Sequence, residues 1–195
     1  MLYNLSEITD LIKNRRTVYP EQYTDRKVQK DQIELILKNA QWAPTHGNTQ
    51  PWRFVVYTEK GKKKLSDFLG QLYLEKIEKE KQNSQKLKKL TQRPLNSSVV
   101  IAVCMSRQKE EKILELEEIE AVACAIQNMQ LTCTAYGLGS FWSTPKLIYS
   151  KEMNTFLNLT EKDKCLGLIY IGYPAIKWPK SHRKPIHYNT TWITQ

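Results

Sequence analysis

Apolar residues recur at helical spacing in five stretches of the chain. In residues 5–13 they stand three or four positions apart, which predicts an amphipathic helix. The same spacing predicts helices over 31–42, 61–81 and 113–136, and a short helix over 151–157. The second half of the helix over 113–136 is small and apolar nearly all round. We therefore expect this helix to be buried on more than one side. A partner subunit is one candidate for the surface that buries it.

Short runs rich in β-branched and aromatic residues predict strands over 52–57, 99–105 and 166–174. Residues 141–145 form either a further short strand or a turn. Residues 76–93 are rich in lysine, which predicts an exposed helix end followed by a mobile connection. Helices that alternate with few strands indicate an α+β fold in which helices cover one central sheet.

Length and composition favour a single domain over residues 1–195. Of the 195 residues, 41% are hydrophobic and 26% are charged, which excludes wholesale disorder. The longest apolar runs are far shorter than the roughly 20 residues of a membrane-spanning helix. The first residues contain no apolar signal core, and the four cysteines show no metal-binding or disulfide-like spacing. We expect a cytoplasmic protein with reduced thiols and no membrane partner.

The chain contains 30 Lys+Arg and 20 Asp+Glu, and the resulting net charge of +10 suggests an anionic partner. Nucleic acid, a membrane surface, an anionic cofactor or a merely solvating surface would all fit this excess. No nucleic-acid motif is present, and the lysines of residues 76–93 are interleaved with Glu78 and Glu80 rather than with stacking aromatics. We therefore expect no specific nucleic-acid partner.

The motifs of several enzyme classes are missing from the sequence. It contains no Rossmann or P-loop glycine pattern, no G-x-S-x-G elbow, no H-E-x-x-H and no His/Cys cluster. No metal site is predicted. Glu117 and Glu118 form a carboxylate pair, which we interpret as the solvated start of a helix.

Three polar clusters remain as candidate binding elements. Arg15-Arg16-Thr17 follows the first helix, and its forked donors suit a phosphate or carboxylate, although a solvated basic helix end would look alike. Residues 43–52 carry uncharged donors and acceptors between two prolines, as a planar heterocycle requires, or form an ordinary capped turn. Residues 139–145 follow a helix-ending glycine and form either a ligand loop or a simple connection.

In order and spacing these clusters resemble motifs of the nitroreductase family of FMN-dependent oxidoreductases. The similarity spans about residues 5 to 185. The run from Ala40 to Phe54 is similar to the family pattern A-x-x-A-P-S-x-x-N-x-Q-P-W-x-F. The other matching motifs are Arg15-Arg16-Thr17, Gln127-Asn128, Tyr136-Gly137-Leu138-Gly139-Ser140-Phe141-Trp142, Ile171-Gly172-Tyr173-Pro174 and Arg183-Lys184-Pro185.

The resemblance implies a mostly antiparallel sheet surrounded by helices, in an intertwined homodimer with FMN bound between the two chains. The residues implied to hold the FMN phosphate and ring edge are Arg15, Arg16, Thr17 and Arg183. The loop implied to reach the flavin from the partner chain contains Pro44, Thr45, His46 and Asn48. The segment implied to approach the flavin ring and its N5 contains Trp142, Ser143 and Thr144.

The resemblance also implies an activity. The flavin carries the chemistry, so no catalytic side chain is expected. NAD(P)H would reduce it, and a nitroaromatic, quinone or related small oxidant would reoxidise it in a ping-pong cycle. The alternative is an FMN-binding redox or storage protein without efficient turnover. Ser143 stands where some compact relatives carry a basic residue, and His46 stands where Ser or Gly is common. His46 would contact a substrate or serve as an ordinary loop residue. The sequence leaves open the physiological acceptor, the choice between NADH and NADPH, and any function of the lysine-rich segment.

Overall fold

The computed structural model describes residues 2–194, and four strands form its sheet. The strands are β1 (Trp52–Tyr57), β2 (Val99–Met105), β3 (Gly139–Ser143) and β4 (Lys164–Gly172). Their order across the sheet is β1-β2-β4-β3, and every neighbouring pair is antiparallel. The α+β expectation is confirmed.

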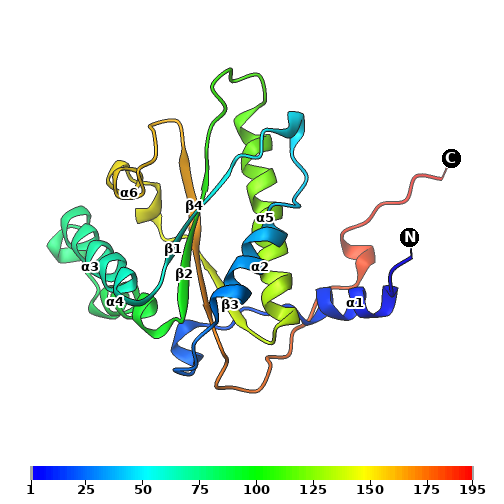
Figure 1. Cartoon of the computed structure of the whole chain (residues 1–195), viewed down its shortest axis with the longest axis horizontal. Helices are drawn as coiled ribbons and strands as arrows, with labels where there is room; N and C mark the ends of the chain where they lie inside the picture. The colour runs from blue at the N-terminus through cyan, green and yellow to red at the C-terminus, as the bar shows by residue number, and fades with distance from the viewer. Residues whose placement is uncertain (1, 195) are drawn as a thin grey trace.

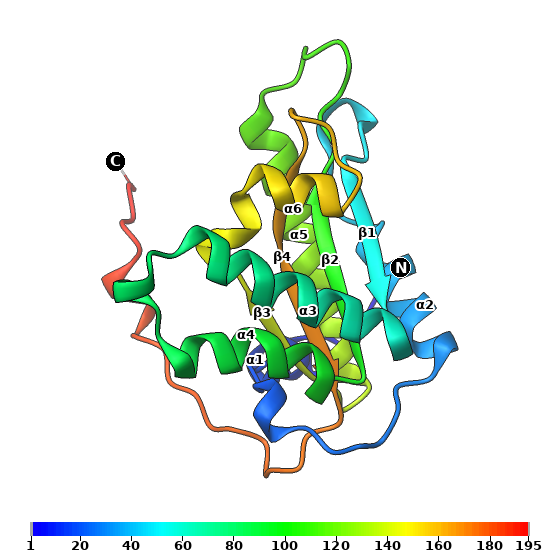
Figure 2. The ribbon, with the colours of Figure 1, turned by 90° about the vertical axis from the view of Figure 1, so that its left-hand side faces the viewer.

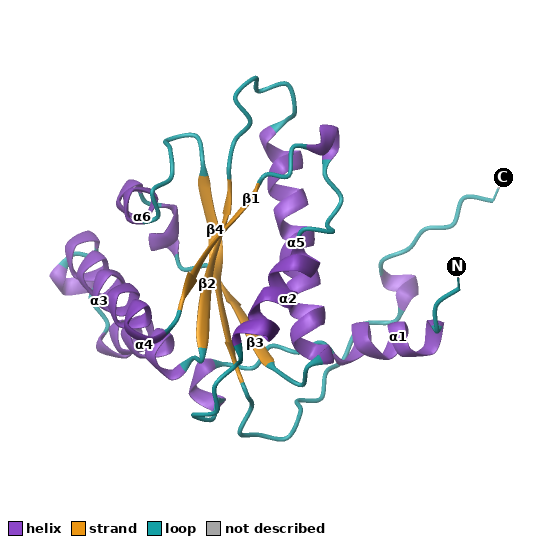
Figure 3. Ribbon diagram, viewed as in Figure 1, coloured by secondary structure: helices purple, strands orange, loops and turns teal. Residues whose placement is uncertain are grey.

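Helices cover both faces of this sheet (Figure 1; Figure 3). They are α1 (Leu5–Asn14), α2 (Lys30–Ala40), α3 (Glu59–Lys76), α4 (Ser84–Asn96), α5 (Glu115–Ala135) and α6 (Lys151–Phe156). Helices α2 and α5 lie on one face, and α3, α4 and α6 lie on the other, as the turned view shows (Figure 2). Helix α1 extends away from the sheet beyond the end of α5.

All residues of β2 are buried, because this central strand contributes to a core on each side of the sheet. Val99, Ile101 and Val103 pack toward α2 and α5. The alternate residues Val100 and Ala102 pack toward α3 and α6. A strand buried on both faces reads as a continuous apolar run, which is the pattern that predicted it.

The mobile connection predicted within residues 76–93 is wrong for residues 84–93, which belong to α4. The Asn83 side chain caps this helix by accepting a hydrogen bond from the Lys86 amide at 3.0 Å. Leu90 and Pro94 are buried, Leu87 and Thr91 are half-buried, and these four residues share one helical face. The lysines occupy the other positions and obscure this face in the composition. The preceding helix ends at Lys76, five residues before the predicted end at residue 81.

Within the described residues, no helix is long and apolar enough to cross a membrane.

Candidate functional site

Three arginines gather where α1 ends, and together we call Arg15, Arg16 and Arg183 the arginine group. Arg15 is half-buried at the end of α1. Burial, followed by the positive charges of Arg183 and Arg16, lowers the pKa of Arg15. Within residues 2–194, no carboxylate pairs with the Arg15 guanidinium. The repulsion between these cations is therefore not offset by the protein itself.

Arg16 differs from the other two arginines because its guanidinium is bonded to the backbone of a segment far away in the sequence. Its Nε donates to the Pro179 carbonyl at 2.9 Å, and its Nη1 donates to the Lys13 carbonyl. Nearby, Trp178 Nε1 donates to the Asn14 carbonyl at 2.6 Å. These bonds hold the C-terminal segment against the end of α1. Trp178 and Pro179 were not among the predicted site residues. The sequence signal that could have indicated them is a tryptophan within an otherwise polar C-terminal segment.

Thr17 connects the arginine group to the sheet. It forms a parallel β-bridge with Ser140, the second residue of β3, and the Val18 amide donates to the Ser140 carbonyl at 3.1 Å. Trp142 and Ser143 therefore lie on the strand that begins beside Thr17, and Thr144 follows it directly. A strand advances about 3.3 Å per residue, so these predicted residues fall within roughly 15 Å of Thr17.

Trp142 is fixed on the sheet by its indole. Its Nε1 donates to the Leu166 carbonyl at 3.0 Å, and the ring covers Gly167. A Cβ at Gly167 would lie 2.1 Å from Trp142 Nε1, and Gly167 has a φ of +154°. Only glycine fits this position. The indole N–H is thus used within the chain, while Ser143 is half-buried and Thr144 is exposed at the end of the strand.

Residues 44–50, which we call the polar loop, form the second part of the predicted site. Gly47, Asn48 and Gln50 have positive φ values of 57°, 52° and 46°. Thr45 Oγ1 lies 3.0 Å from Thr49 Oγ1 and accepts from the Gln50 amide at 3.2 Å. These bonds hold the loop in a backbone conformation that non-glycine residues rarely adopt. The loop borders an open cavity of ≈ 490 Å³ lined by Thr45, Asn48 and Gln50 among others.

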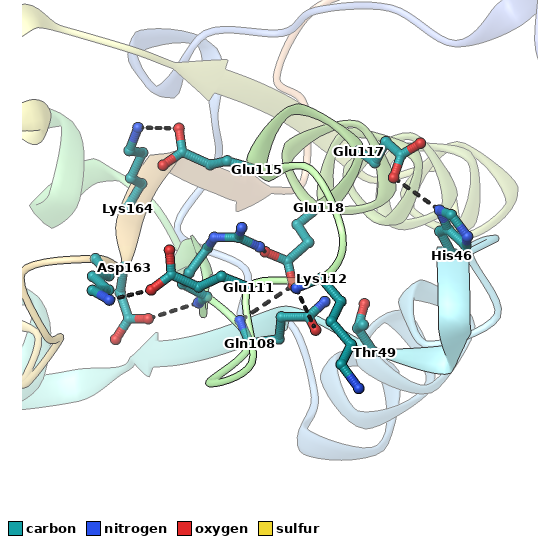
Figure 4. Close-up of polar contacts among 12 residues, drawn as sticks. His46, Thr49, Gln108, Glu111, Lys112, Glu115, Glu117, Glu118, Asp163 and Lys164 are labelled. Atoms are coloured by element: carbon teal, nitrogen blue, oxygen red, sulfur yellow. Dashed lines mark hydrogen bonds and ion pairs between the residues drawn. The ribbon is translucent and has the colours of Figure 1, made fainter.

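A hydrogen bond between side chains anchors the polar loop to the first turn of α5. His46 Nδ1 lies 2.8 Å from Glu117 Oε2 (Figure 4). The adjacent Glu118 turns inward, where it is 1% exposed and lies 2.5 Å from Arg107 Nη1. The interpretation of the carboxylate pair as a solvated helix start is therefore wrong for Glu118, whereas the Glu117 side chain is 38% exposed in the first turn of α5. Glu117 holds a loop and Glu118 neutralises a buried cation, and only their tertiary neighbours reveal this.

The two parts of the predicted site lie at opposite ends of α5. The polar loop contacts the N-terminal turn of α5. The arginine group lies near its C-terminal end, where Leu11 of α1 shares a cavity with Ala135 and Tyr136 (Figure 1). A helix of 21 residues is about 30 Å long. The structure thus brings together Arg15, Arg16, Thr17 and Arg183 near β3, and it keeps Pro44, Thr45, His46 and Asn48 of the same chain apart from them.

The architecture is the nitroreductase-like α+β fold. A nitroreductase-like family protein of Bacillus cereus shares it with a TM-score of 0.84 and 30% identity, over 99% of each chain. The family model described as Nitroreductase family matches residues 12–173, and the chain belongs to the nitroreductase family.

Two further relatives cover most of the chain. YfhC of Bacillus subtilis, named provisionally as an NAD(P)H nitroreductase, is 26% identical over 186 residues, which are 95% of this chain and 93% of YfhC. A Desulfovibrio desulfuricans protein, provisionally a nitroreductase and solved in complex with FMN, has a TM-score of 0.74 and 24% identity, over 99% of each chain.

Proposed function

We propose that the chain is an FMN-dependent NAD(P)H oxidoreductase, with the FMN phosphate held by Arg15 and Arg183. The observation that carries this proposal is the half-buried Arg15, which faces other arginines without a carboxylate partner within residues 2–194. A phosphate between these cations would offset their repulsion, and the forked donors of arginine match its oxygens. The FMN complex of the Desulfovibrio protein and the name of YfhC support the cofactor and the reductant.

The neighbouring residues fit the rest of such a cofactor. Thr17 would contact the ring edge, and the end of β3 would offer the backbone of Trp142, Ser143 and Thr144. The fixed indole of Trp142 keeps that backbone in place. Because Arg16 Nε donates to the Pro179 carbonyl, we assign Arg16 chiefly to positioning the C-terminal segment that carries Arg183.

We further propose that each site is completed by the polar loop of a second copy of the chain, in an intertwined homodimer. Helix α1 buries none of its residues within its own chain. An apolar cavity of ≈ 500 Å³ lies between α1, α2 and α5. Large apolar side chains are exposed on these helices and the C-terminal segment: Leu5, Ile8, Ile12, Leu35, Trp42, Ile186, Tyr188, Trp192 and Ile193. Apolar surface of this extent is typical of a subunit interface.

Bound FMN would supply two-electron hydride transfer from NAD(P)H to a nitroaromatic, quinone or related small oxidant in a ping-pong cycle. The residues of the chain would bind and orient the flavin and the substrates. The arginine group attracts phosphates, and Pro44, Thr45, His46 and Asn48 of the polar loop would line the oxidant's side of the site. One domain over residues 1–195 would suffice. We also propose a cytoplasmic location, which the four free thiols fit.

Flavin titration of the purified protein tests the phosphate site. FMN should bind more tightly than riboflavin, which lacks the phosphate. The substitution Arg15→Ala should weaken FMN binding by about ten- to a hundredfold, as the loss of a charge-assisted hydrogen bond predicts, and leave riboflavin binding unchanged. Lys184→Ala is the matched control and should change neither affinity. Equal affinity for the two flavins, or no flavin binding at all, would contradict the proposal.

Anaerobic mixing with NADH and with NADPH then separates an enzyme from a flavin-binding protein without turnover. Rapid bleaching of the flavin absorbance by either nucleotide is the result expected of an enzyme. Bleaching over many minutes would favour the storage or redox-binding alternative.

A further inference from the structure

His46 carries the one imidazole of the polar loop, and imidazole is the side-chain type that most often serves as a general acid. The other members are Pro44, Thr45, Gly47, Asn48, Thr49 and Gln50. The His46 side chain is 62% exposed, so no hydrophobic packing accounts for its presence. Its loop is held in an unusual backbone conformation by internal hydrogen bonds. The imidazole therefore sits on a fixed support and faces solvent.

Glu117 determines which ring nitrogen of His46 stays available. An ionised carboxylate only accepts hydrogen bonds, so Nδ1 carries the hydrogen that faces Glu117 Oε2 at 2.8 Å. This leaves Nε2 pointing away from α5 and free to donate a proton when the ring is charged. Within residues 2–194, Glu117 is the charged group that contacts the ring.

We propose that His46 is the proton donor to the oxidising substrate, with Glu117 as the positioning residue that orients its ring. The inference rests on the proposed function, in which the polar loop of one chain lies against the flavin held by the other. It also specifies the acceptor class: carbonyl or nitro compounds that must gain a proton together with the hydride, rather than acceptors of electrons alone.

The step balances for a quinone. NAD(P)H supplies a hydride through the site, and the hydride converts the quinone to its oxyanion. The imidazolium Nε2–H bond breaks, and the proton joins that oxygen to complete the hydroquinone. His46 is left neutral and regains a proton from solvent. Because the ring is exposed, this return needs no buried path.

Two acceptors separate proton transfer from electron transfer. The holoenzyme is assayed with NADH and either 1,4-benzoquinone or ferricyanide, which takes electrons without protons. His46→Gln should lower kcat/KM for benzoquinone by about a hundredfold, in the range of general acid catalysis, and lower ferricyanide reduction far less. In His46→Ala, added imidazole should restore part of the benzoquinone activity.

Glu117→Gln tests the positioning role. It should lower the benzoquinone rate less than His46→Gln does. Glu115→Gln is the matched control, because Glu115 lies on the same helical turn but pairs with Lys164, and it should have no effect. A readout independent of turnover is ¹⁵N NMR of the His46 ring. Nδ1 should carry the hydrogen in the unmodified protein, and Glu117→Gln should shift the tautomer mixture.

The outcomes distinguish the two proposals. Unchanged benzoquinone reduction in His46→Gln, or an equal loss with both acceptors, would overturn the role of His46 while the proposed function stands. A protein that reduces neither acceptor and binds no FMN would overturn the proposed function itself.

Discussion

At the scale of single residues, the buried pair Arg107–Glu118 has the largest energetic consequence. The Arg107 side chain is 10% exposed and the Glu118 side chain 1% exposed, and the Glu118 carboxylate also accepts from the Gln108 amide at 3.3 Å. The Arg107 amide in turn donates to Asp163 at 2.8 Å. This network fastens the connection between β2 and α5, which lies next to the polar loop (Figure 4).

We expect Glu118→Ala to lower the free energy of unfolding by about 3–5 kcal/mol, because it leaves the Arg107 charge buried without a partner. Urea denaturation measures this loss. The double variant Arg107→Met with Glu118→Leu should recover much of it, since no unpaired charge then remains. A loss below about 1 kcal/mol in Glu118→Ala would show that water reaches and solvates Arg107.

The residue types of the arginine group and the polar loop could be predicted from the sequence, but the partners of these residues could not. Glu117 and Glu118 are neighbours on a helix, and which of them faces inward depends on how α5 is rotated against β2. Likewise, the bond from Arg16 to Pro179 joins residues far apart in the chain. Contacts of this kind arise from tertiary packing, which local pattern does not encode.

At the scale of elements, the end of β4 fits closely around one aromatic ring. A Cβ at Gly172 would lie 2.5 Å from Tyr23 Cδ2 and 2.6 Å from its Cγ. The ring is held in place because the Tyr23 hydroxyl donates to the carbonyls of Val18 at 2.8 Å or Tyr170 at 3.0 Å. Val18 follows directly after Thr17, so this contact also supports the arginine group.

Gly172→Ala should therefore destabilise the protein by about 1–3 kcal/mol, the usual cost of overpacking a filled site. Thermal unfolding followed by circular dichroism measures the change. The control is Gly61→Ala in α3, where the nearest atom to a Cβ lies 3.7 Å away. That change should be neutral or stabilising by up to about 1 kcal/mol, because alanine favours helix. Equal melting temperatures for the two variants would contradict the close fit.

Most elements follow from apolar spacing, and the exception has a physical cause. In α4, Leu87, Leu90 and Thr91 are buried or half-buried, and lysines surround them in the sequence. Average hydrophobicity over such a segment is low, although its periodicity is helical. The packing of α4 against α3, with Ser66 Oγ donating to the Thr91 carbonyl at 2.7 Å, supplies the stability that composition does not indicate.

At the scale of the whole molecule, charge and apolar surface lie in different places. Lysines are abundant on α3 and α4, on one side of the sheet, whereas many of the exposed apolar residues lie on α1, α2 and the C-terminal segment on the other. Two chains would carry twice the net charge of +10. Such a dimer would attract anions in general, and the arginine group would be the site where an anion binds specifically.

Ile12→Asp should convert a dimer into monomers and remove FMN binding, because a charge on the exposed face of α1 opposes its burial by a partner. Sedimentation velocity and flavin absorbance measure the two effects. Leu74→Asp is the control, since Leu74 is 50% exposed on α3 and Ile12 is 55% exposed on α1. The control should stay dimeric and keep its flavin. Monomeric unmodified protein that binds FMN fully would contradict the two-chain site.

The length of α5 has a genetic consequence. In the proposed dimer, each site takes its arginine group from one chain and its polar loop from the other, because α5 keeps the two apart within a chain. Consider a dimer of one chain with a defective Arg15 and one chain with a defective polar loop. One of its two sites contains both defects, and the other site contains neither. Two alleles that are each inactive alone would therefore complement one another when expressed together.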